Sequence, residues 1–198
     1  MFEKKKIFIG IEISEEVQKQ LWGVSVSMQR FGYPIGWISQ EKFHITLIFL
    51  GYLAEEKLDK VVTVLQETMF SFSSFIVTLG KISAFPSIKN PRVIFVSLID
   101  GLGQTKNIYD DLSRSLSGTG FTLEKQEFTP HVTLGRVKDD DFYLKRKVGE
   151  MISRFKLPNF KMFRVSTISL FESIQVSREF VYKVLLSVPL GKPQTRFT

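Results

Sequence analysis

The sequence predicts a mixed α/β or α+β fold with largely antiparallel sheets. Strand-like apolar segments alternate with amphipathic helices, and several strands also follow one another as hairpin-like pairs. No linker, charge block or low-complexity segment divides the chain. We therefore expect the 198 residues to form a single two-lobed domain over positions 1–198, long enough to bury a core without disulfides.

In the first half of the chain, strands and helices alternate. An apolar, β-branched segment near the N-terminus is typical of a strand. Ser14 is a good N-cap with two glutamates in the first helical turn, and apolar residues then recur every three to four positions until Gly32. The expected elements are a strand at Lys6–Glu12, a helix from Ser14 to Phe31, a strand at Phe43–Leu50 closed by Gly51, and a helix over Leu58–Met69.

In the second half, some strands are adjacent. Phe75–Leu79 and Arg92–Leu98 predict two strands, and the segment A-F-P-S-I-K-N-P between them predicts a connection because its prolines interrupt regular structure. The tail from Gly191 is expected to fray. The other expected elements are a helix over Ile108–Leu116 ended by the turn at 118–120, a strand at His131–Val137, a helix at Asp139–Phe155, and strands at Phe160–Val165, Ser166–Ser173 and Phe180–Val188.

Composition excludes several kinds of chemistry. The chain has no cysteine, which rules out disulfides, thiolate zinc sites, iron–sulfur clusters and cysteine nucleophiles, and which fits a reducing compartment. Neither a membrane span nor a signal peptide is predicted, so we expect a cytoplasmic protein without a membrane partner. The net charge of +7 favours an anionic partner such as nucleic acid.

The only two histidines lie in one repeated pattern. Residues 44–47 read H-I-T-L and residues 131–134 read H-V-T-L, each at the start of an apolar strand that lies downstream of an expected helix. This repetition indicates a duplicated supersecondary unit. Because side chains alternate between the two faces of a strand, His44 shares a face with Thr46, and His131 shares a face with Thr133. If the two strands flank one cleft, two imidazoles and two hydroxyls converge on it.

Such a set of side chains suits phosphodiester chemistry. A neutral imidazole can take a proton from attacking water, and an imidazolium can give one to a departing ribose oxygen. An ordinary histidine pKa of about 6.5 permits either state near neutrality. The threonine hydroxyls can hydrogen-bond to the non-bridging phosphate oxygens. We expect neither a metal nor a cofactor, because two histidines without cysteine make a poor zinc site.

At these residues the sequence resembles the two-histidine (2H) phosphoesterases, specifically the RNA 2′,3′-cyclic phosphodiesterase branch, also called the 2′-5′ RNA ligase family. The segments that carry the resemblance are K-I-F-I-G-I-E-I-S-E-E-V, Trp37 with F-H-I-T-L-I-F-L-G, A-F-P with R-V-I-F-V, F-T-P-H-V-T-L-G-R, and S-L-F-E-S with Y-K-V-L. The resemblance implies a bilobal fold, with two pseudo-symmetric lobes of largely antiparallel sheet flanked by helices around a central cleft. It also implies hydrolysis of a terminal RNA 2′,3′-cyclic phosphate to a 2′-phosphomonoester.

The resemblance also implies roles for individual residues. His44 corresponds to the proton donor to the 3′ oxygen, and His131 to the base that activates water; the spacing of the motifs does not decide this order. Arg136 matches the arginine that follows the family's second motif. A regular strand would place Arg136 on the face opposite His131, whereas a bulge or strand end at Gly135 would let its guanidinium reach the phosphate.

Two aromatic residues are further candidates for the substrate site. Trp37 and Phe43 are candidates for stacking on a base, with a core position the alternative for Phe43.

The alternative activities are 2′-5′ RNA ligation and cleavage of another cyclic or 2′-5′-linked nucleotide, because the same acid/base pair can run backwards. A non-catalytic RNA-end binding module is also open, although binding phosphate would not need histidines. The expected partner is RNA with a 2′,3′-cyclic phosphate end, and the expected state is a monomer.

Overall fold

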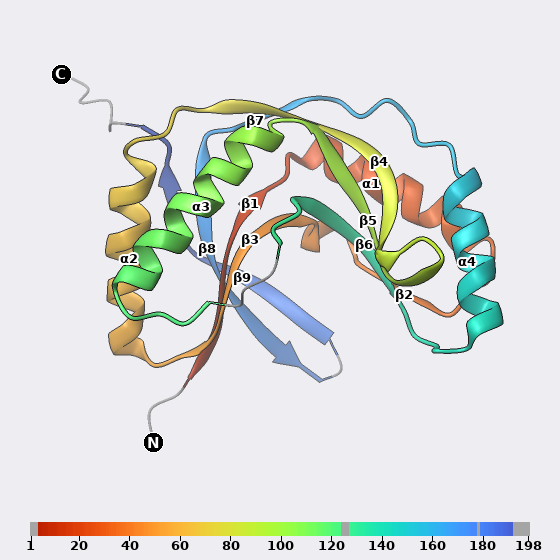
Figure 1. The fold of residues 1–198 in the computed structure, drawn as a ribbon, viewed down its shortest axis with the longest axis horizontal. Helices are drawn as coiled ribbons and strands as arrows, with labels where there is room; N and C mark the ends of the chain where they lie inside the picture. Colours follow the sequence, from red (N-terminus) through yellow and green to blue (C-terminus); the bar gives the residue numbers. More distant parts are fainter. Residues whose placement is uncertain (1–3, 124–126, 178, 192–198) are drawn as a thin grey trace.

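Within the described part of the chain, one strongly curled sheet of nine strands organises the fold (Figure 1). The computed structural model describes residues 4–123, 127–177 and 179–191, so the tail expected to fray after Gly191 lies outside the described residues. The strand order is β7-β4-β5-β6-β3-β1-β8-β9, and β2 pairs with β6 beside this path. The strands are β1 (Lys5–Glu12), β2 (Ile35–Trp37), β3 (His44–Leu53), β4 (Phe75–Ser87), β5 (Asn90–Asp100), β6 (His131–Val137), β7 (Phe163–Val165), β8 (Thr167–Val176) and β9 (Glu179–Pro189).

The sheet has two halves that meet between its two central strands. Four strands lie on the β3 side of the junction, and β6 with its neighbours lies on the other. Each central strand is the last part of a strand–helix–strand unit, β1-α1-β3 or β5-α3-β6, and each is flanked by the first strand of its own unit. This arrangement agrees with the duplicated unit that the two histidine motifs predicted, and with the predicted mixed fold of largely antiparallel strands.

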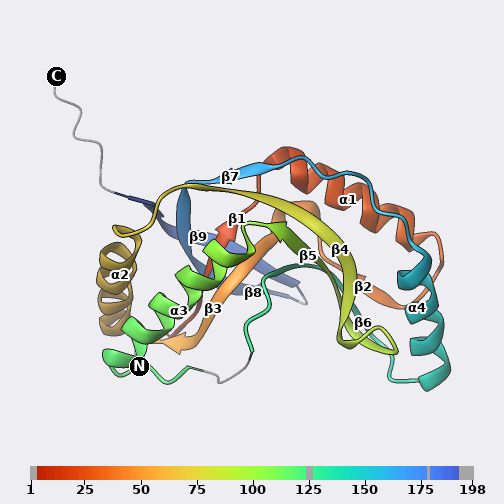
Figure 2. The same ribbon diagram turned by 45° about the horizontal axis from the view of Figure 1, so that its top comes forward.

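Two of the four helices in the described part of the chain, α1 and α3, tie the two halves together (Figure 2). α1 (Glu15–Gln29) follows β1 but packs against β6, whereas α3 (Leu102–Gly118) follows β5 but packs against β3 and α2 (Glu55–Met69). α4 (Phe142–Arg154) covers β4 and β5. Because each unit sends its helix to the opposite half, neither half has a complete core alone. None of these helices is long and apolar enough to cross a bilayer.

One predicted connection is wrong. The segment A-F-P-S-I-K-N-P was expected to link two short strands, but β4 and β5 instead form a long hairpin that turns at 88–89. Pro86 and Pro91 face each other near the end of this hairpin, next to a register shift. Here β4 is an edge strand, because β7 pairs only with its residues 75–77. Proline is tolerated at edges and irregularities, since no ladder hydrogen bond is lost there.

Other element boundaries also differ between the sequence prediction and the structure. β2 and the short 3₁₀ helix η1 (Gln40–Lys42) were not predicted, because each spans only three residues and has no readable periodicity. The last α-helix begins at Phe142 and not at Asp139, since the Asp141 carboxylate caps it by accepting the N–H of Leu144 at 2.8 Å. The strand expected from Phe160 begins at Phe163.

α4 makes a close approach to the β4–β5 turn that depends on a glycine. A Cβ added to Gly149 would clash with the backbone carbonyl oxygen of Ile88, so the backbone would have to move. We therefore expect Gly149→Ala to lower the free energy of unfolding by about 1–3 kcal/mol. Gly23 in α1 is the control, because a Cβ there meets nothing within 4 Å.

We expect Gly23→Ala to raise the unfolding free energy by about 0.5–1 kcal/mol, through helix propensity alone. Urea unfolding of both variants measures the two effects. An unchanged midpoint for Gly149→Ala would show that helix α4 does not need this close contact.

Candidate active site

The two histidine motifs meet at the junction of the sheet halves. Ile45 of β3 lies directly opposite Val132 of β6, and both side chains are 0% exposed. Opposite residues of an antiparallel pair point to the same face, so the residues on either side of this pair point to the other face. His44, Thr46, His131 and Thr133 therefore share one face of the sheet, as the motif spacing predicted.

This register also sets the spacing of the site. Counted from the Ile45–Val132 pair, His44 falls opposite Thr133, and Thr46 falls opposite His131. The two histidines are diagonal neighbours, which places their backbones about 7–8 Å apart. That spacing leaves room for a phosphate group between the two imidazoles.

Each motif strand carries the same irregularity. In β3, Thr46 pairs with Gly10 and Ile48 with Ile9, so Leu47 is an extra residue without a partner on β1. In β6, Thr133 pairs with Phe95 and Gly135 with Ile94, so Leu134 is extra in the same way. Each bulge shifts the alternation of faces by one residue. The fifth residue after each histidine is thereby returned to the histidine's own face.

Arg136 is one of these two fifth residues. The sequence left open whether β6 bulges or ends before it; the strand bulges and continues to Val137. Arg136 is exposed on the face of His131, and its cationic guanidinium contributes to lowering the pKa of that imidazole. The corresponding residue of β3 is Phe49, which is 61% exposed. Only the β6 side of the site thus presents a cation at this position.

The ring of His44 is held at both nitrogens. Its Nδ1–H donates to the carbonyl oxygen of Lys42 at 2.8 Å, because a carbonyl only accepts. In the neutral ring the proton is therefore on Nδ1, and Nε2 accepts from the Thr46 hydroxyl at 2.9 Å. Three aromatic rings surround the imidazole: Phe8 at 4.9 Å, Tyr182 edge-on at 5.0 Å and Phe171 at 5.9 Å between centroids.

The ring of His131 is held in a matching way. Its Nδ1–H donates to the carbonyl oxygen of Thr129 at 2.7 Å, which leaves the Nε2 lone pair for a ligand. Phe85 and Phe95 stack on each other, and each lies 5.0 Å from the imidazole. Both histidines therefore use the carbonyl two residues earlier to fix the same tautomer.

The surroundings lower the pKa of both imidazoles below 6.5. Burial is the largest cause for each, and the hydrogen bond to a backbone carbonyl works in the opposite direction. A positive charge on His131 lowers the pKa of His44 further, and the Arg136 guanidinium lowers that of His131. The effect of the His131 charge on the pKa of His44 agrees with the diagonal placement of the two residues.

Of the two candidate base-stacking residues, Trp37 and Phe43, only Phe43 is buried. Phe43 is 2% exposed and belongs to the core, which is the alternative that the sequence had left open. Trp37 of β2 lies opposite Gly135 and packs against the core, 3.1 Å from where a Cβ on that glycine would be. Gly135 follows the bulge and faces the core, so Trp37 lies on the face away from Arg136. The stacking hypothesis is corrected for Phe43, and for the half-buried Trp37 it stays a prediction.

Several residues of the site were not found from the sequence. The carbonyls of Lys42 and Thr129 carry no side-chain signal, and the aromatic neighbours come from strands distant in sequence. Glu12 was also missed: it lies opposite His44 in the β1–β3 pair and therefore shares its face. Its position as the acidic residue that ends an apolar strand was the available signal.

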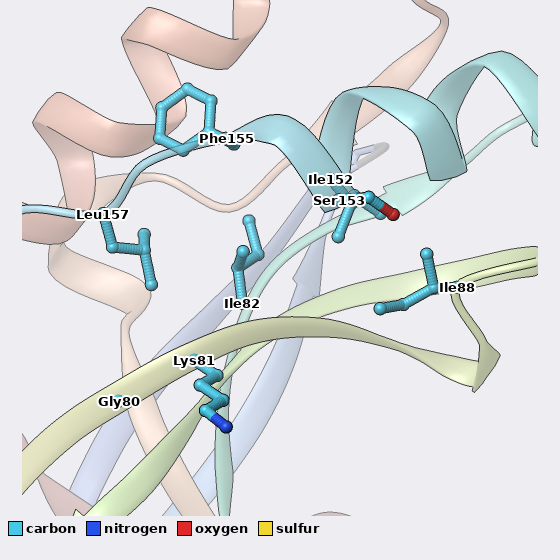
Figure 3. Close-up of a pocket in the computed structure, with 8 residues that line it drawn as sticks. All are labelled: Gly80, Lys81, Ile82, Ile88, Ile152, Ser153, Phe155 and Leu157. Carbon is cyan, nitrogen blue, oxygen red and sulfur yellow. The ribbon is translucent and has the colours of Figure 1, made fainter.

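Two pockets differ sharply in size and chemistry. The larger, about 470 Å³, lies between β4 and the end of α4 and contains neither histidine (Figure 3). Its walls are mostly apolar, with Lys81 and Ser153 the polar side chains. The smaller, about 100 Å³, is lined by His44 together with Glu12 and Tyr182. Within the described residues, no three His, Cys, Asp or Glu side chains gather as a metal site would require.

Comparison with known proteins points to one family. The RNA 2′,3′-cyclic phosphodiesterase of Thermotoga maritima is 30% identical over 180 residues, which cover 91% of this chain and 92% of that protein. The protein of the same name from Aeropyrum pernix is 34% identical over 169 residues, which cover 82% and 90%.

Solved structures show the same fold. TT0787 of Thermus thermophilus matches with a TM-score of 0.78 at 21% identity, over 95% of this chain and all of that one. E. coli LigT in its apo form matches with a TM-score of 0.73 at 17% identity, over 96% and 99% of the two chains. The bilobal fold that the resemblance implied is thereby confirmed. A model of the 2′-5′ RNA ligase superfamily matches residues 17–175, and the chain, with both histidine motifs inside that range, belongs to this family.

Proposed function

We propose that this protein hydrolyses the 2′,3′-cyclic phosphate at the end of an RNA to a 2′-phosphomonoester. The observation that carries the proposal is the diagonal placement of two imidazoles with the same tautomer across the Ile45–Val132 pair. The relatives named RNA 2′,3′-cyclic phosphodiesterase, from several bacteria and archaea, support it. The positively charged chain is suited to an anionic substrate.

In the proposed reaction the two histidines act on opposite sides of the phosphorus. His131 takes a proton from water through Nε2, and the water oxygen attacks the phosphorus. The bond from phosphorus to the 3′ oxygen breaks on the far side, and His44 in its protonated form gives its Nε2 proton to that oxygen. The products are a 3′ hydroxyl and a 2′-phosphate.

The electrostatics of the site support this order of roles. The guanidinium of Arg136 favours the neutral form of His131, which is the form that a base needs. When His131 is neutral, it carries no charge that would lower the pKa of His44. Arg136 thus favours the form of the singly protonated pair in which the proton is on His44, while burial disfavours the charged form of both rings.

The remaining side chains of the site suit the phosphate oxygens. Thr46 and Thr133 place one hydroxyl on each strand beside the histidines, on the same face. Arg136, brought to this face by the bulge at Leu134, supplies a cation with a forked donor geometry. These groups would hold the anionic phosphate in line between acid and base.

We also propose that the protein acts as a monomer in the cytoplasm. One chain supplies both histidines, both threonines and the arginine, so the site needs no residue from a second copy. A chain without cysteine has no disulfide to form, and it fits a reducing compartment.

Product identity is the direct test of the proposed activity. We expect an oligoribonucleotide with a 2′,3′-cyclic phosphate end to yield only the 2′-phosphate, and at the same rate with EDTA present, because both proton transfers use imidazoles. Chromatography against synthetic 2′- and 3′-phosphate standards identifies the product. A 3′-phosphate product, or loss of turnover on adding EDTA, would contradict the mechanism.

Removing either histidine should abolish most of the turnover. We expect His44→Ala and His131→Ala each to lower kcat by about 10²- to 10⁴-fold, as loss of a general acid or base does. The double variant should be scarcely slower than the slower single variant, because both groups act in one step. Partial rescue by added imidazole would separate lost chemistry from lost structure. Near-full activity in either single variant would exclude the paired role.

The lowered histidine pKa values set the pH dependence. The active form carries one proton on the pair, and both pKa values lie below 6.5, so we expect kcat/KM to peak below pH 6.5 and fall about tenfold per pH unit on the alkaline side. Bound phosphate stabilises the imidazolium, which should move the kcat profile to higher pH. Initial rates from about pH 4.5 to 8.5 measure both profiles, and a kcat/KM maximum above about pH 7 would refute the prediction.

A further inference from the structure

We propose that the small pocket beside His44 binds the nucleobase of the terminal nucleotide, and that the Glu12 carboxylate makes it prefer guanine. The inference rests on the proposed function, and it names the specificity of that same site. The pocket of about 100 Å³ is formed where the end of β1, the middle of β8 and the first half of β9 meet the start of β3.

The direction of the proposed reaction places the base on this side. In an in-line displacement the attacking water and the departing 3′ oxygen lie on opposite sides of the phosphorus. The departing oxygen belongs to the terminal ribose and receives its proton from His44. The ribose and its base therefore lie on the His44 side of the phosphate, away from His131, and the pocket that His44 itself lines is within their reach.

Glu12 is fixed in this pocket by a hydrogen-bond network. The Ser169 hydroxyl, which is 0% exposed, donates to Oε1 of Glu12 at 2.6 Å, and the Ser187 hydroxyl donates to the same oxygen at 3.3 Å. Among the described residues, Oε2 has no protein donor in this network. A carboxylate repels a phosphate, so its place opposite His44 suits an N–H donor on the uncharged part of the substrate.

Aromatic rings and a lysine complete the pocket. Tyr182 and Phe171 line it, and the partly exposed Tyr182 ring offers a surface on which a base can stack. Lys42 lines it too, with its ammonium held 3.0 Å from the Glu179 carboxylate. The pocket thus presents a fixed carboxylate in Glu12, a cationic donor and an aromatic wall, with Glu41 and Gln18 as its further polar lining residues.

Guanine is the base that matches this set. Its ring N–H and amino group are adjacent donors that one carboxylate can accept, and its O6 beside them can accept from Lys42. Adenine and cytosine place a ring-nitrogen lone pair next to the amino group, which would face the carboxylate unfavourably. Uracil flanks its single N–H with two carbonyl oxygens. Glu12 therefore discriminates against the other three bases.

The test compares four oligoribonucleotides that differ only in the last residue, each ending in a 2′,3′-cyclic phosphate. We expect kcat/KM for the guanosine end to exceed the other three by about 10- to 100-fold, and Glu12→Gln to remove this advantage. Glu172→Gln is the matched control, because Glu172 follows Phe171 on β8 and faces the other side of the sheet. It should keep the wild-type preference.

Two further outcomes separate this inference from the proposed function. Equal kcat/KM values for all four ends, or a guanosine preference that survives Glu12→Gln, would overturn the inference while leaving the hydrolysis intact. If no end were hydrolysed, the proposed function would fail. Calorimetric binding of the four nucleoside 2′-monophosphates would then still decide the inference, with tighter binding of 2′-GMP expected for wild type only. If Glu12→Gln changed the pH profile in the same way for all four ends, the role of Glu12 would instead be to set the pKa of His44.

Discussion

The site depends on one backbone pairing, the antiparallel contact of Ile45 with Val132. These two buried residues join the halves of the sheet, and each is flanked by a histidine and a threonine on the opposite face. A shift of one residue in this register would turn one motif's functional side chains into the core. α1 packs against β6 of the other unit, and α3 packs against β3 of the other unit. Each half therefore has a core built from both units, which fixes β3 and β6 against each other.

The leucine of each motif has a second role that periodicity does not reveal. Leu47 and Leu134 are the extra residues of two bulges, and each is buried together with the residue that follows it. The bulges keep the core packed through two consecutive inward residues, and they return the fifth residue after each histidine to the site. A strand without a bulge would leave Arg136 on the buried side, where an unpaired guanidinium is costly.

The sequence predicted the parts of the site that depend on local order. The two-residue alternation placed both histidines and both threonines on one face, and most long strands and helices followed from their apolar periods. The sequence alone could not predict the Pro86–Pro91 end of the long hairpin, because a strand tolerates proline there only if β4 is an edge strand. Nor could it predict the pocket around Glu12, since Ser169 and Ser187 come from strands at the other end of the chain.

The duplicated framework is symmetric in its acid/base groups but not in what surrounds them. Both imidazoles have the same tautomer, set by a carbonyl two residues earlier, so the backbone alone does not distinguish donor from acceptor. The difference comes from the fifth residue, a cation beside His131 and an aromatic ring, Phe49, on the His44 side. A cation in one half lowers the proton affinity of the neighbouring histidine only. In the proposed reaction this side-chain difference favours His131 as the base, while the repeated strands supply the geometry.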